Sequence, residues 1–354
     1  MSQSPVGIAV IGAGFMGEVY CEAITRLVKD ARLVACAGGT RSASLAARQG
    51  VAHEASPEAA FRRPDVQVAI IATPHSTHLP LTQSAAAAGK HVFVEKPMGR
   101  TVAEYDAMLN ACRDAGVLVA VNKLTRFRES PAATKRLIDQ GAIGQVRMLR
   151  ATGSSVGLAA SPDELQRWYL DPAEGSVYLD WGSHICDMLR WLAGSDAVTA
   201  YGRFATYTHD IPKPDQSGMA EYAFANGVLA QVWMSSEVPA PGLHGGAEGH
   251  DVSQYIVVGS EGILECDMFG TLQLGKGDSW TVVAEQPPID WVNAPFHENR
   301  IGGWARQVQD FVDCVRNGGV PLVTGEDGRA AVEMVEAAER SHATSSVVRL
   351  PLTG

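Results

Sequence analysis

The sequence predicts an α/β protein of two domains: a doubly wound parallel sheet at the N-terminus, then an α+β domain built on a largely antiparallel sheet. Over residues 1–125, short β-branched apolar runs alternate with longer segments rich in Ala, Leu and Glu, which is the pattern of βαβ units. Beyond residue 125 the apolar runs follow one another and are joined by turns. A chain of 354 residues is also long for one domain. We therefore expect domains at residues 1–125 and 126–354.

The first domain is expected to alternate strands with helices. The strands are apolar runs at residues 7–11, 32–37, 67–72, 91–95 and 118–121. The helices are expected to begin near residues that favour a helix N-terminus, namely Gly14, Ser42, Pro57, Thr77 and Thr101.

The second domain is expected to be rich in hairpins. Two alternating runs flank Asn226 and Gly227, and this dipeptide is the strongest short-range hairpin signal. Further strands are expected within residues 146–155, 198–208, 255–268 and 281–286. Helices are expected at residues 131–140, 162–170, 183–192, 305–318 and 329–343, and a loop rich in Gly and Pro at 239–250.

The composition indicates a soluble, cytoplasmic enzyme whose partner is a small molecule. No apolar run reaches the ~20 residues that span a bilayer, and the N-terminus lacks the pattern of a signal peptide. The net charge of -10 is spread along the chain without a Lys/Arg cluster, so we expect neither nucleic acid nor membrane as a partner. The six cysteines lie far apart without a CxxC pair, which favours buried, reduced thiols.

A glycine motif follows the first expected strand. Gly12, Gly14 and Gly17 form GxGxxG at the start of a helix, with Phe15 and Met16 inside the motif. Its glycines permit a tight turn, close approach of the backbone to a pyrophosphate, and close packing of helix on strand. Because the motif lies inside a βαβ pattern, it predicts a dinucleotide-binding domain of the Rossmann type.

The end of the second expected strand bears on which dinucleotide is bound. The acidic residue that usually holds the ribose 2'-hydroxyl is missing, and Thr40 and Arg41 stand there instead. A hydroxyl and a guanidinium suit a 2'-phosphate, which favours NADP over NAD. In the alternative interpretation these two residues simply start a helix.

Polar residues also end the two following strands, on the side of the sheet where ligands of open α/β proteins bind. Thr73, Pro74 and His78 follow the strand at 67–72, and we expect them near the cofactor. Glu95 and Lys96 end the strand at 91–95. An isolated lysine is usually a solvated side chain, but one that ends a buried strand can donate or accept a proton.

A second polar motif lies in the other domain. Asp180, His184 and Asp187 belong to DxGxHxxD at the beginning of an expected helix. An imidazole beside carboxylates is what proton relay from an alcohol requires, although a lone histidine is more often structural. His75 and His78 have no third ligand nearby, so we expect no bound metal.

Together these motifs resemble the Gfo/Idh/MocA family of glucose-fructose oxidoreductase and inositol dehydrogenase relatives. The resemblance spans nearly the whole chain in a shared order of motifs: GAGFMG, IIATPHSTH, VEKP, RF at 126–127, IGQV at 143–146, YLDWGSH and FVDCVRNGGVPLVTGEDGRAAVEM. It implies that Lys96 hydrogen-bonds a substrate hydroxyl beside the nicotinamide, that His184 is the acid/base partner, and that Asp180 orients substrate or imidazole. Trp168 and Tyr169 are similar in placement to family residues near the sugar, or are core aromatics.

The resemblance implies an NAD(P)-dependent oxidoreductase acting on a sugar, polyol or cyclic alcohol. Lys123 and Arg126 are candidates for binding substrate hydroxyls or carboxylates. They lie in a segment where this chain departs from the pattern of the family. One alternative is a glycosidase or eliminating enzyme that oxidises a sugar carbon transiently. A second is a non-catalytic dinucleotide sensor. Face-to-face pairing of the second domain's sheet is expected to give a homodimer or homotetramer.

Overall fold

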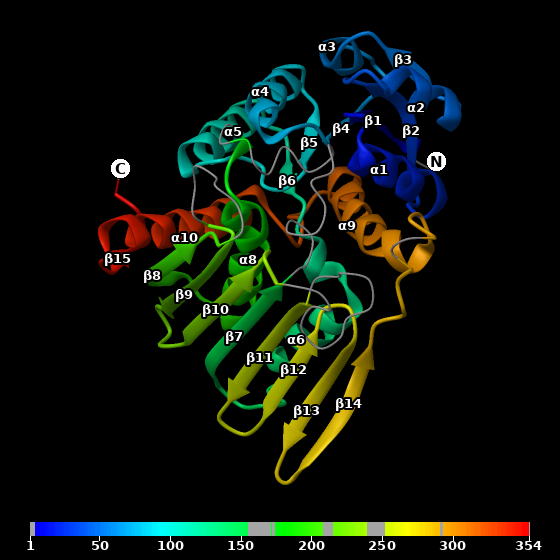
Figure 1. Cartoon of the computed structure of the whole chain (residues 1–354). Helices are drawn as coiled ribbons and strands as arrows, with labels where there is room; N and C mark the ends of the chain where they lie inside the picture. Colours follow the sequence, from blue (N-terminus) through cyan, green and yellow to red (C-terminus); the bar gives the residue numbers. More distant parts are fainter. Residues whose placement is uncertain are drawn as a thin grey trace. The chain divides into compact units, whose positions relative to one another are not determined.

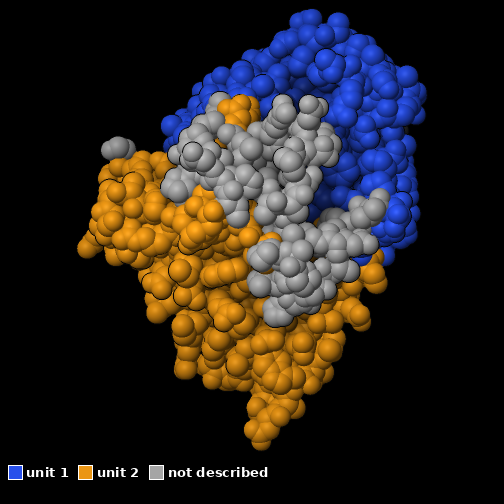
Figure 2. All heavy atoms as spheres, in the orientation of Figure 1, with its two compact units in different colours: residues 1–127, 289–329 blue, residues 128–288, 330–354 orange. Residues whose placement is uncertain are grey.

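The computed structural model describes residues 4–154, 171, 174–207, 215–238, 252–290 and 293–353 (Figure 1). The chain divides into two compact units, coloured separately in Figure 2. The first unit comprises residues 1–127 and 289–329, and the second comprises residues 128–288 and 330–354.

The first unit is built on a parallel sheet of six strands in the order β3-β2-β1-β4-β5-β6, which confirms the doubly wound prediction. The strand bounds are β1 Val6–Ile11, β2 Ala31–Ala37, β3 Ala52–Glu54, β4 Val68–Ile71, β5 His91–Val94 and β6 Val119–Val121. The sequence did not predict β3, a three-residue edge strand that pairs with the end of β2.

Helices connect these strands and begin close to the expected residues. Ser56 and Thr101 cap their helices, because each hydroxyl accepts a hydrogen bond of 3.2 Å from the backbone N–H three residues on. The helices are α1 Phe15–Arg26, α2 Ser42–Gln49, α3 Pro57–Phe61, α4 His78–Ala87 and α5 Val102–Asp114, with short turns η1 His75–Thr77 and η2 Leu124–Phe127.

A late helix, α9 (Glu298–Asn317), belongs to the first unit, although its position in the sequence, beyond residue 125, predicts the second domain. Its apolar face is buried in the core that also contains β1, β4 and α1. Phe311 on this face makes an edge contact with Phe93 of β5, at 5.7 Å between ring centroids. The sequence pattern showed that α9 has an apolar face but not which core that face enters.

The second unit is built on a sheet of nine strands in the order β14-β13-β12-β11-β7-β10-β9-β8-β15. Neighbours are antiparallel except β10 and β7, so the largely antiparallel prediction is confirmed. The bounds are β7 Val146–Ser154, β8 Ala197–Ala205, β9 Ser217–Phe224, β10 Leu229–Ser235, β11 Val252–Gly259, β12 Ile263–Asp267, β13 Thr271–Lys276, β14 Ser279–Glu285 and β15 Val348–Arg349.

Helices of this unit contact its sheet, among them α6 (Glu129–Asp139), which contacts β12 to β14, and α8 (Ser183–Ala193), which contacts β7 (Figure 1). Helix α10 (Gly325–Thr344) crosses the boundary between the units. No helix among the described residues is long and apolar enough to span a membrane. The helix expected at 162–170 and the loop expected at 239–250 lie outside the described residues.

Candidate active site

The glycine motif forms the turn between β1 and α1. Gly12 has φ of 112°, and a Cβ there would lie 2.2 Å from the carbonyl oxygen of Ala72. A Cβ on Gly17 would lie 2.1 Å from the carbonyl oxygen of Gly12. The first and third glycines are therefore required by the packing of the turn itself.

The second glycine is different. A Cβ on Gly14 would meet only one described atom within 4 Å, a guanidinium nitrogen of Arg41 at 3.9 Å. Gly14 is also the N-cap of α1, where no side chain caps the helix. Open space before uncapped N–H groups fits a dinucleotide pyrophosphate.

The end of β2 turns sharply through Gly38 and Gly39, at φ of 78° and 80°. Thr40 and Arg41 follow and are exposed, and Arg41 is the N-cap of α2 without a side-chain capping bond. The next acid along the chain, Glu54 on β3, is held in an ion pair of 2.7 Å with Arg63. The same guanidinium also binds the Asp65 carboxylate at 2.9 Å, so Glu54 is already engaged by a basic partner.

Beyond β4, the backbone passes through Thr73 and Pro74 into η1 and α4. The Thr77 hydroxyl lies 2.7 Å from both the Thr73 hydroxyl and the Pro74 carbonyl oxygen, which fixes this turn. His78 is fully buried, with Nδ1 3.0 Å from the Pro97 carbonyl oxygen and Nε2 2.9 Å from that of Thr73. Its side chain therefore bonds to the protein's own backbone.

At the end of β5, the buried Glu95 carboxylate accepts three hydrogen bonds. The donors are the Tyr20 hydroxyl at 2.6 Å, the Asn122 amide at 2.7 Å and the Lys96 backbone N–H at 2.9 Å. Burial and the neighbouring carboxylate raise the pKa of Tyr20 well above its usual value, so this phenol remains a donor. Lys96 itself is partly exposed. From its buried position at the end of β5, Glu95 thus fixes the backbone N–H of Lys96 by a hydrogen bond.

The segment after β6 contains Lys123 and Arg126, the two candidates for contact with substrate hydroxyls or carboxylates. Lys123 is fully buried, and its backbone N–H donates to the Gln307 side chain at 3.1 Å. The Arg126 guanidinium, also buried, lies 3.5 Å from the Asp327 carboxylate and donates to the Leu322 carbonyl at 3.2 Å. These contacts tie the segment to α9 and the start of α10.

In the second unit, Asp180 lies in a π-helical turn, η5 (Tyr178–Gly182), that leads directly into α8. Its side chain is 1% exposed, while His184, four residues on, is partly buried. Such turns are rare and occur frequently at functional sites. Asp187, one turn further, is also buried. Trp168 and Tyr169 lie outside the described residues.

Hydroxyl groups hold this turn in place. The Tyr178 and Tyr222 hydroxyls lie 2.9 Å apart, and Tyr222 donates at 3.2 Å to the Met334 carbonyl on α10. The Ser176 hydroxyl accepts from the Leu179 N–H at 2.9 Å and donates to the Glu339 carboxylate at 2.8 Å. Burial raises the pKa of both tyrosines well above the usual value.

The residues predicted for the site are divided between the units. The glycine turn, Arg41, the β4 turn and Lys96 belong to the first unit, and Asp180 and His184 belong to the second. Among the described residues, no group of three or more His, Cys, Asp or Glu side chains could hold a metal.

Three polar residues that support the site were not predicted from the sequence: Tyr20, Asn122 and Tyr105, whose hydroxyl accepts a hydrogen bond of 2.9 Å from the Met98 N–H. Asn122 carried a signal, since it is a polar residue at the carboxyl end of a buried strand, like Lys96. The two tyrosines carried none, because each lies on a helix and meets its partner only in the fold.

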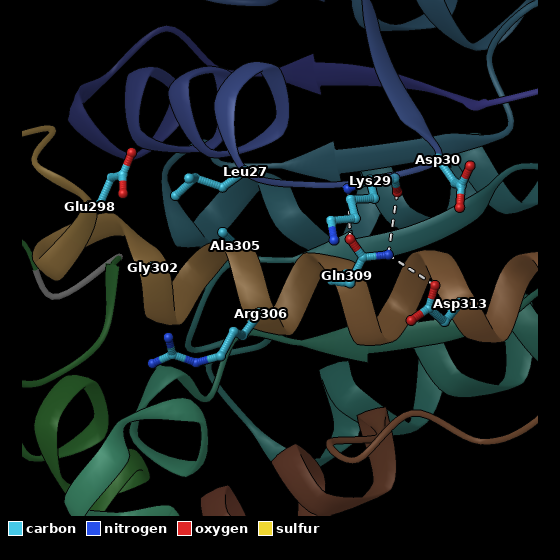
Figure 3. A pocket seen from close by; sticks show the side chains of 9 residues that line it. All are labelled: Leu27, Lys29, Asp30, Glu298, Gly302, Ala305, Arg306, Gln309 and Asp313. Atoms are coloured by element: carbon cyan, nitrogen blue, oxygen red, sulfur yellow. Dashed lines mark hydrogen bonds between the residues drawn. The ribbon is translucent and has the colours of Figure 1, made fainter.

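A groove of about 600 Å³ also marks the surface of the first unit, beside α9 (Figure 3). Gln309 crosses it, accepting from the Lys29 backbone N–H at 2.7 Å and donating to Asp313 at 2.9 Å. None of the predicted site residues lines it, so we do not assign the chemistry to it.

The fold and the glycine turn define a dinucleotide-binding protein of two units. The model of the oxidoreductase family with an NAD-binding Rossmann fold, Gfo/Idh/MocA, matches residues 6–123, and the model of its C-terminal alpha/beta domain matches residues 135–350. The chain belongs to this family, and it is an oxidoreductase with an NAD-binding domain.

Individual relatives agree with this assignment. The scyllo-inositol 2-dehydrogenase (NAD(+)) of Bacillus subtilis is 29% identical, over 98% of this chain and 96% of its own. The levoglucosan dehydrogenase of Pseudarthrobacter phenanthrenivorans is 32% identical, over 61% of this chain and 57% of its own. A solved levoglucosan dehydrogenase in complex with NADH and levoglucosan is similar in fold, with a TM-score of 0.83 at 24% identity over 99% of this chain and 100% of its own.

Proposed function

We propose that the protein is a nicotinamide-dependent dehydrogenase acting on a secondary alcohol of a sugar, polyol or related cyclic alcohol. The observation that carries this proposal is the placement of Lys96 on the same edge of the parallel sheet as the glycine turn. The turn follows β1 and Lys96 follows β5, and ligands of open α/β sheets bind at that edge. The relatives named for inositol and levoglucosan support the substrate class.

In this proposal the chain's residues handle a proton while the cofactor handles the hydride. A bound nicotinamide supplies the hydride acceptor or donor. As hydride leaves the carbon of an alcohol, its hydroxyl proton must also leave, and we assign this proton to His184. Lys96 donates a hydrogen bond to the same oxygen, and Asp180 orients the imidazole or substrate. In the reverse direction the proton returns to the oxygen of the ketone.

Two substitutions test the proposal. Lys96→Ala and His184→Ala should each lower kcat by roughly 100-fold to 10,000-fold, the usual contribution of a general acid or base. Turnover is followed by NAD(P)H absorbance on a panel of cyclic polyols, aldoses, glycosides and dihydrodiols. Dissociation constants for the cofactor, from fluorescence titration, should stay close to wild type.

Lys29→Ala provides a matched control, because Lys29 is an exposed lysine of the same unit in the groove beside α9 (Figure 3). It should leave kcat unchanged. Near-native kcat in both Lys96→Ala and His184→Ala would overturn the assignment of roles.

For the cofactor, we propose a preference for NADP over NAD. Arg41 is exposed beside Gly14, Thr40 precedes it, and Glu54 is paired with Arg63. Arg41→Ala should weaken NADP binding by roughly tenfold to a hundredfold, the value of a charge-assisted hydrogen bond, and leave NAD binding nearly unchanged. Arg48→Ala, on the same helix but ion-paired to Glu18, is the control. Equal losses for both cofactors would contradict the preference.

We also propose that two copies pair through the open face of the nine-stranded sheet, in a homodimer or homotetramer. Met148 and Leu229 lie opposite each other in the register of β7 and β10, and both are more than half exposed, at 54% and 52%. The next row on the sheet reads Glu221, Gln231, Arg150, Ile256 and Glu265, so it offers a second copy a basic residue flanked at a distance by two acidic ones.

Light scattering tests this pairing. Met148→Asp, which places a charge in the apolar row formed with Leu229, should reduce the measured mass to that of one chain. Val320→Asp, at a residue 78% exposed in the first unit, should leave the mass unchanged. A wild-type mass equal to one chain would contradict the proposal.

A further inference from the structure

The turn that carries Lys96 is irregular in backbone conformation yet held at successive residues. A reactive side chain on a loop keeps its position only when surrounding groups fix the backbone beneath it. Here each contact joins a side chain to a backbone group: Lys96 N–H to the Glu95 carboxylate at 2.9 Å, Pro97 carbonyl to His78 Nδ1 at 3.0 Å, and Met98 N–H to the Tyr105 hydroxyl at 2.9 Å.

The inner side of the turn is closely packed. Pro97, Met98 and Gly99 are buried, while Lys96 is partly exposed. A Cβ on Gly99 would lie 3.0 Å from side-chain atoms of Glu104 and Tyr105, so the backbone rests directly on α5. Lys96 is therefore the residue of this turn that a ligand can reach.

His78 joins this turn to the preceding strand. Its ring is fully buried, and its second nitrogen, Nε2, lies 2.9 Å from the Thr73 carbonyl oxygen beyond β4. Burial, with a smaller contribution from His75, lowers the pKa of His78 to about 4, so at neutral pH the ring has one N–H. A carbonyl oxygen only accepts, so the ring donates to one of the two carbonyls at a time.

We propose that His78 is a positioning residue that carries its proton on Nδ1 and holds Lys96 in place by donating a hydrogen bond from Nδ1 to the Pro97 carbonyl. The inference rests on the proposed role of Lys96 and adds a residue that itself touches neither substrate nor cofactor. Pro97 directly follows Lys96, so a shift of this carbonyl moves the Lys96 Cα. A displacement of about 1 Å at a reacting group can cost on the order of 100-fold in rate.

Two amide substitutions separate the two contacts of the ring. The amide nitrogen of Asn can occupy the place of Nδ1, and that of Gln the place of Nε2. His78→Asn thus keeps a donor for Pro97, His78→Gln keeps one for Thr73, and His78→Ala keeps neither. Thr82→Ala, at another fully buried side chain of α4, controls for general loosening of the helix.

We expect His78→Ala to lower kcat by roughly 10-fold to 100-fold while KM for the cofactor changes less than about threefold. His78→Asn should recover most of the loss and His78→Gln should not. The pH profile of kcat/KM should keep its wild-type shape, because His78 transfers no proton. Thr82→Ala should leave kcat unchanged.

Hydrogen exchange gives a readout that does not depend on turnover. The backbone amides of Glu95, Lys96, Met98 and Gly99 should exchange about fivefold to tenfold faster in His78→Ala, as expected for one lost hydrogen bond, and return toward wild type in His78→Asn. Unchanged exchange in His78→Ala, or rescue of kcat by Gln but not Asn, would overturn the inference. Near-native turnover of Lys96→Ala would instead overturn the proposed function. The exchange data would still show whether His78 holds the backbone of residues 95–99.

Discussion

The two units hold their predicted site residues in different ways. In the first unit, Lys96 and the glycine turn lie on loops at strand ends, and close backbone packing and side-chain bonds to backbone groups fix those loops. In the second unit, Asp180 lies within a π-helical turn that leads into α8. The Tyr178 hydroxyl, bonded to the Tyr222 hydroxyl, and the Ser176 hydroxyl, bonded to the Glu339 carboxylate, hold this turn. A loop needs its neighbours to give it a conformation, whereas a helix needs them only to set its position.

This difference predicts where each unit is most easily damaged. The first unit should be sensitive to an added atom where the backbone of a turn is closely packed, as at Gly12 and Gly17. It should also be sensitive to the loss of single hydrogen bonds from side chains to the backbone of its turns. The second unit should tolerate the loss of one hydroxyl, because its helix keeps its own backbone hydrogen bonds.

The largest effect is expected at the third glycine of the turn. Gly17→Ala places a Cβ 2.1 Å from the Gly12 carbonyl oxygen, so helix and strand must separate, at a cost on the order of 3 kcal/mol in the free energy of unfolding. Gly14→Ala, where the space is open, should change stability by less than about 1 kcal/mol yet weaken dinucleotide binding at least tenfold. Denaturant titration measures the change in stability, and cofactor titration measures the change in dinucleotide affinity. Equal losses of stability in the two variants would contradict the view that Gly17 serves packing and Gly14 serves cofactor binding.

The next effect concerns pH. The folded pKa of His78, about 4, lies below the ordinary value of 6.5, so as pH falls the unfolded chain takes up this proton first. The free energy of unfolding should therefore decrease between pH 6.5 and 4, by up to about 3 kcal/mol from this group, and level off below. His78→Asn should lack this part of the slope, and identical slopes in both proteins would refute the buried, neutral ring.

The smallest changes in stability are expected when one buried tyrosine in each unit is replaced by phenylalanine. Tyr20→Phe removes a donor from the Glu95 carboxylate and should cost about 1.5 to 3 kcal/mol of stability. Tyr178→Phe removes a neutral bond, and Tyr222 keeps the Met334 carbonyl as acceptor, so about 0.5 to 1.5 kcal/mol is expected. A larger loss from Tyr178→Phe, by denaturant titration, would reverse the comparison.

The features of the fold that a local sequence pattern encodes could be predicted from the sequence. The glycine motif, the alternation of strands with helices and the polar residues at strand ends all depend on neighbours in the chain. Likewise Asn226 and Gly227, with Gly227 at φ of 88°, form the turn between β9 and β10. The predicted start of α8 at Ser183 also agrees with the structure.

Other features depend on contacts between distant residues and leave no local pattern. The three-residue β3 and the half-buried β13 are too short or too mixed in burial to be recognised without their partners. The π-helical turn at Asp180 differs from an α-helix only in its backbone bonds. The polar partners of Glu95 come from α1 and from the residue after β6, and only folding brings these together.

The position of β7 in the nine-stranded sheet constrains the order in which the second unit can assemble. This strand is central, between β10 and β11, yet it precedes both in the chain by long intervening segments. The hairpins β9–β10 and β11–β12 close short loops and can form quickly, whereas β7 can pair only with strands that lie much later in the chain. During synthesis on the ribosome, β7 emerges before both of its partners, and we expect its pairing to be a late step of folding.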